Sequence, residues 1–197
     1  MTISSPASAH DLDYALSMGT TLLKNISAKQ WSAPTPCTDW NVRQLLTHVV
    51  GMNMVFTALL SGQQPPSRDS EVLGADPAAA YERSARELVE AFSVPGVLER
   101  EFKTPMGSAS GADRLQIRLY DLLAHLWDLA RATTQDLDHD HQLQVLAEKS
   151  LAFATTQISQ TSRVSRFDPP QPIGTTAPAM DRLAAFLGRP ADWRAPQ

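Results

Sequence analysis

The sequence predicts an all-α protein: a four-helix bundle with long crossing connections and a short C-terminal helix. Three observations indicate this fold class. Apolar residues recur at helical spacing in five long segments, stretches rich in proline and glycine separate those segments, and no run has the pattern of a buried strand. Four helices of about 17 to 21 residues are what an up-and-down bundle requires.

The first half of the chain contains two expected helices. The first covers residues 10–26, where leucines follow helical spacing, and the second covers residues 41–60. Thr38 or Asp39 is placed to accept the free N–H groups of the second helix as its N-cap. Residues 61–75 are rich in proline and glycine, so we expect a connection there.

A third helix is expected from Asp76 and Pro77 to residue 92, because aspartate followed by proline is a typical helix start. Residues 93–111 contain several prolines and glycines and predict an irregular crossing, with a short extended piece near residues 101–103.

The remaining helices follow in close succession. The pattern predicts a long fourth helix over residues 112–132 and a fifth over residues 140–160, followed by a proline-rich extended tail. A short amphipathic helix over residues 180–187 closes the chain, and Gly188 and Pro190 end it.

Length and composition narrow the class of protein. A chain of 197 residues can bury a core without disulfides, so we expect one domain over residues 1–197. With 43% hydrophobic residues, 19% charged residues and a net charge of −4, the chain is neither disordered nor basic enough for a nucleic-acid surface. Small molecules or proteins are the expected partners.

The terminus and the longest apolar runs bear on location. The N-terminus lacks a basic stretch followed by an apolar run, and no segment approaches about eighteen uninterrupted apolar residues. We therefore expect a cytoplasmic protein without a membrane partner, present as a monomer or a homodimer.

His48 points toward the interior by helical arithmetic. At 100° per residue, Leu45, Met52 and Phe56 lie within about 80° of its direction. An isolated histidine of this kind is more often a core residue with one hydrogen bond than a metal ligand, so His48 alone decides little.

A narrow polar stripe runs along the fourth helix. Asp121 and His125 are four residues apart and share one face, and Arg114, Arg118 and Asp128 fall within about 60° of the same line. Apolar residues flank the stripe on both sides, so we expect it to face inward. The more exposed face is expected to carry Gln116, Tyr120, Trp127 and Arg131.

An inward carboxylate is costly unless it is paired or coordinated. Arg118 could pair with Asp121 as an i,i+3 salt bridge, which would be a purely structural arrangement. A divalent cation would satisfy His48, Asp121 and His125 together, because carboxylate oxygen and neutral imidazole nitrogen are its preferred donors. We therefore predict one divalent ion, with zinc as the first expectation and nickel, iron or manganese as alternatives.

Two stretches carry a family resemblance: PTPCTDWNVRQLLTHVVGMN at 34–53 and RLYDLLAHLWDLARAT at 118–133. Both resemble the DinB-like metal-binding superfamily, in particular its actinobacterial branch related to the N-terminal domain of mycothiol-dependent maleylpyruvate isomerase. The ending MDRLAAFLGRPADW matches the same branch.

The resemblance covers nearly the whole chain and implies a DinB-like bundle. It also implies a metal held at the positions of His48, Asp121 and His125. The isomerase has glutamate where this chain has Asp121, and it has a second, C-terminal domain that this chain is too short to include.

The resemblance also implies an activity. The first hypothesis is a metal-dependent transferase or isomerase that uses a low-molecular-weight thiol such as mycothiol, because three protein ligands leave coordination positions open. The alternative is a non-catalytic binding or sensing bundle with a structural ion. Asp128 could be a fourth ligand, or it could orient the other ligands. In a third reading, an inert bundle, His48 and Asp121 merely pair.

Three further residues are weighed for a role. Cys37 is the single cysteine, so no intramolecular disulfide and no four-cysteine zinc site can form. It precedes a helix N-terminus, which would favour a thiolate, but no histidine motif lies beside it, and we expect a structural or incidental role. His139 and His141, in the polar run DLDHDHQ, are expected at the surface.

Overall fold

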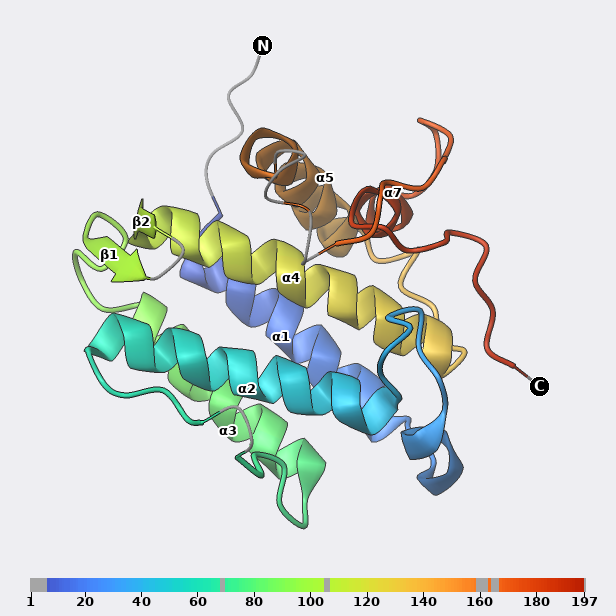
Figure 1. Cartoon of the computed structure of the whole chain (residues 1–197), viewed down its shortest axis with the longest axis horizontal. Coiled ribbons are helices and arrows are strands. Elements are labelled where there is room, and N and C mark those ends of the chain that lie inside the picture. Colours follow the sequence, from blue (N-terminus) through green and yellow to red (C-terminus); the bar gives the residue numbers. More distant parts are fainter. Residues whose placement is uncertain (1–6, 68–69, 105–106, 159–162, 164–166, 197) are drawn as a thin grey trace.

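The structure is a computed structural model that describes residues 7–67, 70–104, 107–158, 163 and 167–196. Four helices form a bundle: α1 (Ala9–Lys24), α2 (Val42–Ser61), α3 (Pro77–Phe92) and α4 (Gly111–Ala132). α1 and α2 each contact both α3 and α4, so the order around the bundle is α1, α3, α2, α4 (Figure 1). The prediction of an all-α bundle with crossing connections is confirmed.

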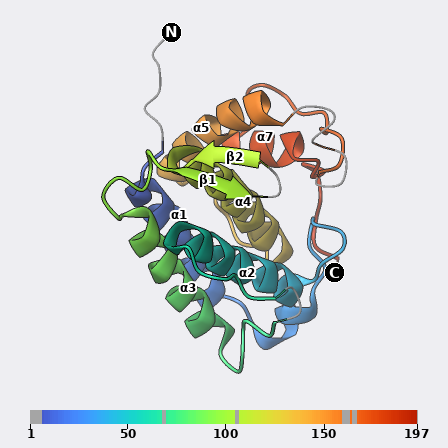
Figure 2. The same ribbon diagram turned by 60° about the vertical axis from the view of Figure 1, so that its left-hand side comes forward.

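The other elements lie at the ends and on one side of the bundle. β1 (Glu101–Thr104) and β2 (Gly107–Ser110) form an antiparallel hairpin at the start of α4 (Figure 2), which confirms the short extended piece expected there. A 3₁₀ helix, η1 (Ala28–Ser32), follows α1. α5 (His141–Gln157) and α7 (Ala179–Phe186) pack against each other and against α4.

α4 is the central helix, and its expected exposed face is buried. Tyr120 and Trp127 are 6% and 2% exposed, and Gln116 is buried as well. Trp127 donates from its indole N–H to the Asp181 carboxylate of α7 at 2.6 Å. The expectation of exposure was wrong because α5 and α7 cover this face, and the periodicity of a single helix contains no information about which elements pack on it.

The helix starts show where local sequence is informative. Asp76 caps α3 with Pro77 in the first turn, as predicted. The N-cap of α2 is Asn41 and not Thr38 or Asp39, since the Asn41 side chain accepts from the Gln44 backbone N–H and the Gln44 side chain accepts from the Asn41 N–H. Thr38 and Asp39 lie instead in an exposed loop closed by the hydrogen bond from the Trp40 N–H to the Cys37 carbonyl.

The other boundaries agree with expectation within about two or three residues. α5 begins after its N-cap Asp140 and ends at Gln157. The last expected residues of this helix, 159–160, lie outside the described residues.

Among the described helices, α2 is the one that is long and apolar enough to cross a membrane. Its mean hydropathy reaches 1.3. Many of its apolar side chains, among them Leu46, Val49 and Val50, are buried, and the helix packs against α3 and α4. This apolar composition is accounted for by a position in the bundle core.

Candidate metal centre

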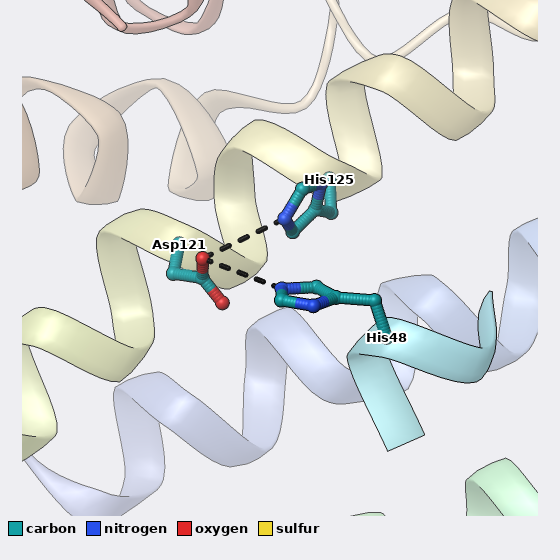
Figure 3. Close-up of side chains that lie close together, drawn as sticks. All are labelled: His48, Asp121 and His125. Atoms are coloured by element: carbon teal, nitrogen blue, oxygen red, sulfur yellow. Dashed lines mark ion pairs between the residues drawn. The ribbon is translucent and has the colours of Figure 1, made fainter. Parts of the chain in front are cut away.

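The structure brings His48, Asp121 and His125 together across the interface between α2 and α4 (Figure 3). The Asp121 Oδ1 atom lies 3.5 Å from His125 Nε2 and 3.9 Å from His48 Nε2. One donor atom from each residue can be chosen so that all three lie within 4.8 Å of one another. The side chains that the sequence selected therefore form one cluster, with both imidazoles directed at the same carboxylate oxygen.

The donor types and their spacing fit a divalent ion. Ligands that surround a tetrahedral ion at the usual zinc distances stand about 3.4 Å apart. The two separations that involve Asp121, 3.5 and 3.9 Å, approach that value, and the two histidine donors lie within 4.8 Å of each other, so the donors would move closer together around an ion. Two imidazole nitrogens and one carboxylate oxygen suit zinc, and they also suit nickel, iron or manganese.

Asp121 uses its two oxygens for different partners. Oδ2 accepts a hydrogen bond from Arg118 Nη1 at 2.8 Å, which leaves Oδ1 directed at the histidines. The Arg118–Asp121 salt bridge and the grouping of His48, Asp121 and His125, which the sequence left as alternatives, are thus both present. Burial alone would raise the pKa of Asp121, but His125, His48 and Arg118 outweigh burial and hold the pKa well below its ordinary value. The carboxylate is therefore ionised, as a metal ligand must be.

Arg118 is itself held by a buried network. The guanidinium is fully buried and donates from Nε and Nη2 to Asn53 Oδ1 at 3.1 and 2.6 Å, and from Nη2 to the Val49 carbonyl at 3.2 Å. The Asn53 amide donates in turn to Ser84 Oγ at 3.0 Å. The sequence interpretation missed Asn53, whose signal is a lone amide in the otherwise apolar run of residues 49–56.

Asp128 and Arg189 form a buried ion pair beside Nδ1 of His125. His125 Nδ1 lies 3.1 Å from Asp128 Oδ2, and Arg189 donates to both Asp128 oxygens at 3.0 and 3.3 Å. Asp128 therefore contacts His125 and Arg189 and lies outside the group of three donors. A carboxylate on Nδ1 fixes the proton there and leaves Nε2 free for an ion.

The same pairing perturbs the titration of His125. Burial would lower the pKa of His125, but Asp121 and Asp128 outweigh it and raise the pKa above its ordinary value. Arg189 was also missed from the sequence. Gly188, with a positive φ of 93°, turns the chain after α7, and Arg189 follows at once.

A cavity of about 680 Å³ opens over the cluster. Its lining combines the three donors with the loop before α2, apolar side chains of α2 and α4, and the C-terminal segment: Pro36, Cys37, Thr38, Asp39, Trp40, His48, Met52, Phe56, Arg114, Ile117, Tyr120, Asp121, His125, Phe167, Asp168, Leu187, Gly188 and Arg189. Trp40 stacks on His48, with ring centroids 4.6 Å apart. A small molecule can reach the donors from this cavity.

Cys37 lines the cavity but is held as a thiol. Burial, followed by the charge of Asp128, raises the pKa of Cys37 to about 12, which overrides any stabilisation of a thiolate by the helix N-terminus. His139 is 95% exposed and pairs with Asp136, and His141 is also exposed, as expected for surface residues.

Comparisons with known proteins agree with this architecture. Residues 15–130 match the family model described as the mycothiol maleylpyruvate isomerase N-terminal domain, a range that includes all three donors. The uncharacterized proteins Rv0738 and MT0763 of Mycobacterium tuberculosis, from strains ATCC 25618 / H37Rv and CDC 1551 / Oshkosh, are each 37% identical over 171 residues. The aligned region covers 85% of this chain and 90% of each relative.

A solved structure shares the fold. The crystal structure of a histidine-to-alanine mutant of mycothiol-dependent maleylpyruvate isomerase matches with a TM-score of 0.50 at 16% identity, over 72% of this chain and 70% of that chain. The family match over more than half of the sequence is the stronger finding, because it includes most of α1, all of α2 and α3, and nearly all of α4. This chain belongs to the mycothiol maleylpyruvate isomerase N-terminal domain family.

Proposed function

We propose that this protein binds one divalent ion through His48, Asp121 and His125 and acts on a low-molecular-weight thiol of the mycothiol type, as a transferase or isomerase. The observation that carries the proposal is the cluster of three donors at an open cavity. The family and the structural neighbour, both named for mycothiol chemistry, supply the substrate class.

The protein groups around the cluster have separable tasks in this proposal. A bound divalent ion would supply Lewis acidity and lower the pKa of a thiol or water. Arg118 keeps Asp121 ionised and oriented, and Asp128 keeps the His125 proton on Nδ1. Met52, Phe56 and Ile117 give the cavity apolar wall that binds carbon chains and excludes water.

An open site is favoured over a structural one by the donor count. Structural zinc sites usually close with four protein ligands. Asp128, the candidate for a fourth ligand, is bound by His125 and Arg189, and the donor cluster of the described residues consists of His48, Asp121 and His125. The alternative function, a non-catalytic binding or sensing bundle, would require that no thiol reaches the ion.

We propose that residues 1–197 form one domain. α5 and α7 contact α4, the central helix of the bundle, in addition to each other. They complete the burial of α4 and contribute Asp181 to its outer face, so we expect the described elements to fold as a unit.

Metal content and a cobalt spectrum test the proposal directly. Untagged protein should contain about one divalent ion per chain. Cobalt-substituted protein should develop a sulfur-to-metal charge-transfer band when mycothiol is added, whereas S-methylated mycothiol, which lacks the free thiol, should leave the spectrum unchanged. A loaded site that shows no spectral response to saturating mycothiol would favour the structural or sensing alternative.

A further inference from the structure

Arg114 lies on the same face of α4 as the metal centre. Asp121 and His125 follow it by seven and eleven residues, so both of these side chains point within about 20° of the Arg114 direction. At 1.5 Å per residue, Asp121 lies about 10 Å farther along the helix axis. Arg114, Asp121 and His125 all line the one cavity, which therefore extends from the donors toward the β-hairpin.

Among the described residues, no carboxylate forms an ion pair with Arg114. Arg114 is 5% exposed, and its Nη2 donates to the carbonyls of Phe102 and Gly107 at 2.9 Å and to Thr104 Oγ1 at 3.3 Å. All three acceptors are neutral oxygens of the hairpin. Nε is buried without an acceptor, and no carboxylate of the described residues lies within ion-pair distance.

The other buried arginines of the described chain are paired differently. Arg118 forms an ion pair with Asp121, and Arg189 forms one with Asp128. A buried cation without an anion is costly, and such cost is commonly offset at a site where a ligand brings the missing charge. Arg114 is therefore the exception among these three, and it is the one whose missing partner could come through the cavity.

We infer that Arg114 recognises a carboxylate of the substrate, at the end of the cavity opposite the metal centre. A carboxylate carries one negative charge and matches one guanidinium, whereas a phosphate dianion would leave a second negative charge unpaired. Met52, Phe56 and Ile117 line the same cavity as Arg114 and the three donors. The site thus takes an organic acid or thiol conjugate whose carboxylate is separated from the reacting atoms by a short apolar chain.

The anion subsite can be tested without the metal. In metal-free protein, hexanoate should bind at least about tenfold more tightly than its neutral match hexanamide, as followed by NMR titration. Arg114→Gln should abolish the preference for the acid, and Arg114→Lys, which keeps the charge, should retain part of it. Arg100→Gln is the matched control, because Arg100 is an exposed arginine next to the same hairpin and does not line the cavity.

Equal affinity of wild type for the acid and the amide, or an unchanged preference in Arg114→Gln, would overturn the inference. The comparison of the acid with the amide on wild type does not depend on whether the variants fold. With cobalt-loaded protein, each mercapto acid is compared with its own amide. The ratio of the two affinities should be larger for 6-mercaptohexanoate than for mercaptoacetate, because only the longer chain reaches from the ion to Arg114.

The position of Arg114 relative to the thiol rests on the proposed function, and the two can fail separately. If both thiols gave the charge-transfer band with no acid preference at either length, the anion subsite would be wrong and the thiol proposal would stand. If neither thiol gave the band while hexanoate still outcompeted hexanamide in metal-free protein, the thiol proposal would be wrong and the subsite would stand.

Discussion

The two sides of the candidate metal centre are supported to different degrees. On α4, Asp121 is held through its second oxygen by Arg118, and His125 is held through its second nitrogen by Asp128. On α2, His48 is 28% exposed, stacks on Trp40, and has no hydrogen bond to its Nδ1 among the described residues.

The difference follows from burial. Arg118 and Asp128 are fully buried, and buried polar groups need partners, so the network behind α4 is complete and fixes the geometry of two donors. His48 is half-buried and can use water as a partner. We infer that α4 presents a preorganised pair of ligands and that α2 supplies a third donor able to adjust as an ion enters from the cavity.

The largest expected effect removes a donor from either side. His48→Ala, Asp121→Ala and His125→Ala should each lower metal affinity by more than the roughly 10–100-fold that loss of an orienting partner costs. An open site with three protein ligands has no spare donor. Metal analysis after dialysis, followed by competition with a chelator, measures the loss.

The double variant His139→Ala/His141→Ala is the control, since both residues lie on an exposed segment and should not affect binding. If this control lost the ion while His48→Ala retained it, the ligand assignment would be wrong. In wild type, affinity should fall as the pH drops. Because the pKa of His125 is raised, the fall should begin above the usual histidine value near 6.5.

The next effect weakens the α4 side without touching a donor. Asp128→Asn should lower metal affinity by roughly 10–100-fold, because His125 loses the carboxylate that orients its ring. The same change leaves Arg189 without its anion, so the free energy of unfolding should fall by about 3–5 kcal/mol in urea denaturation. Asp136→Asn, an exposed carboxylate beside an exposed histidine, is the matched control.

A smaller effect is expected on the α2 side. Trp40→Leu removes the ring that stacks on His48 at 4.6 Å, and aromatic pairs of this kind contribute about 0.5–1.5 kcal/mol. Metal affinity should therefore fall by roughly two- to tenfold, less than for Asp128→Asn. Trp31→Leu is the control, since Trp31 lies in η1 and does not line the cavity. A loss as large as that of Asp128→Asn would show that α2 is as rigidly supported as α4.

The smallest effect is expected at Cys37. Cys37→Ser should leave metal affinity unchanged, because the thiol lies outside the donor cluster and its pKa, raised to about 12 by burial, keeps it protonated. Alkylation of wild type by iodoacetamide at pH 8 should be much slower in the folded than in the unfolded protein, and it should accelerate as the pH rises toward 12. Loss of the ion in Cys37→Ser would add sulfur to the ligand set.

The sequence by itself determined the helices, and it predicted that His48, Asp121 and His125 lie together. Helix starts such as Asp76 with Pro77 depend on adjacent residues, and the i,i+4 spacing of Asp121 and His125 places both on one face whatever packs nearby. His48 could be assigned to the same cluster because a bundle brings inward faces of different helices together. These features depend on adjacent residues or on the helical repeat of a single segment, so they can be predicted from the sequence.

Only the tertiary structure decided how the donors are supported. Asn53 meets Arg118 across 65 residues, and Arg189 meets Asp128 across 61, and both contacts depend on how separate elements pack. The burial of Tyr120 on the outer face of α4 likewise depends on α5 and α7. The helical repeat of a sequence indicates which side of a helix is apolar. The partner of a buried charge depends on how elements that are distant in sequence pack against each other.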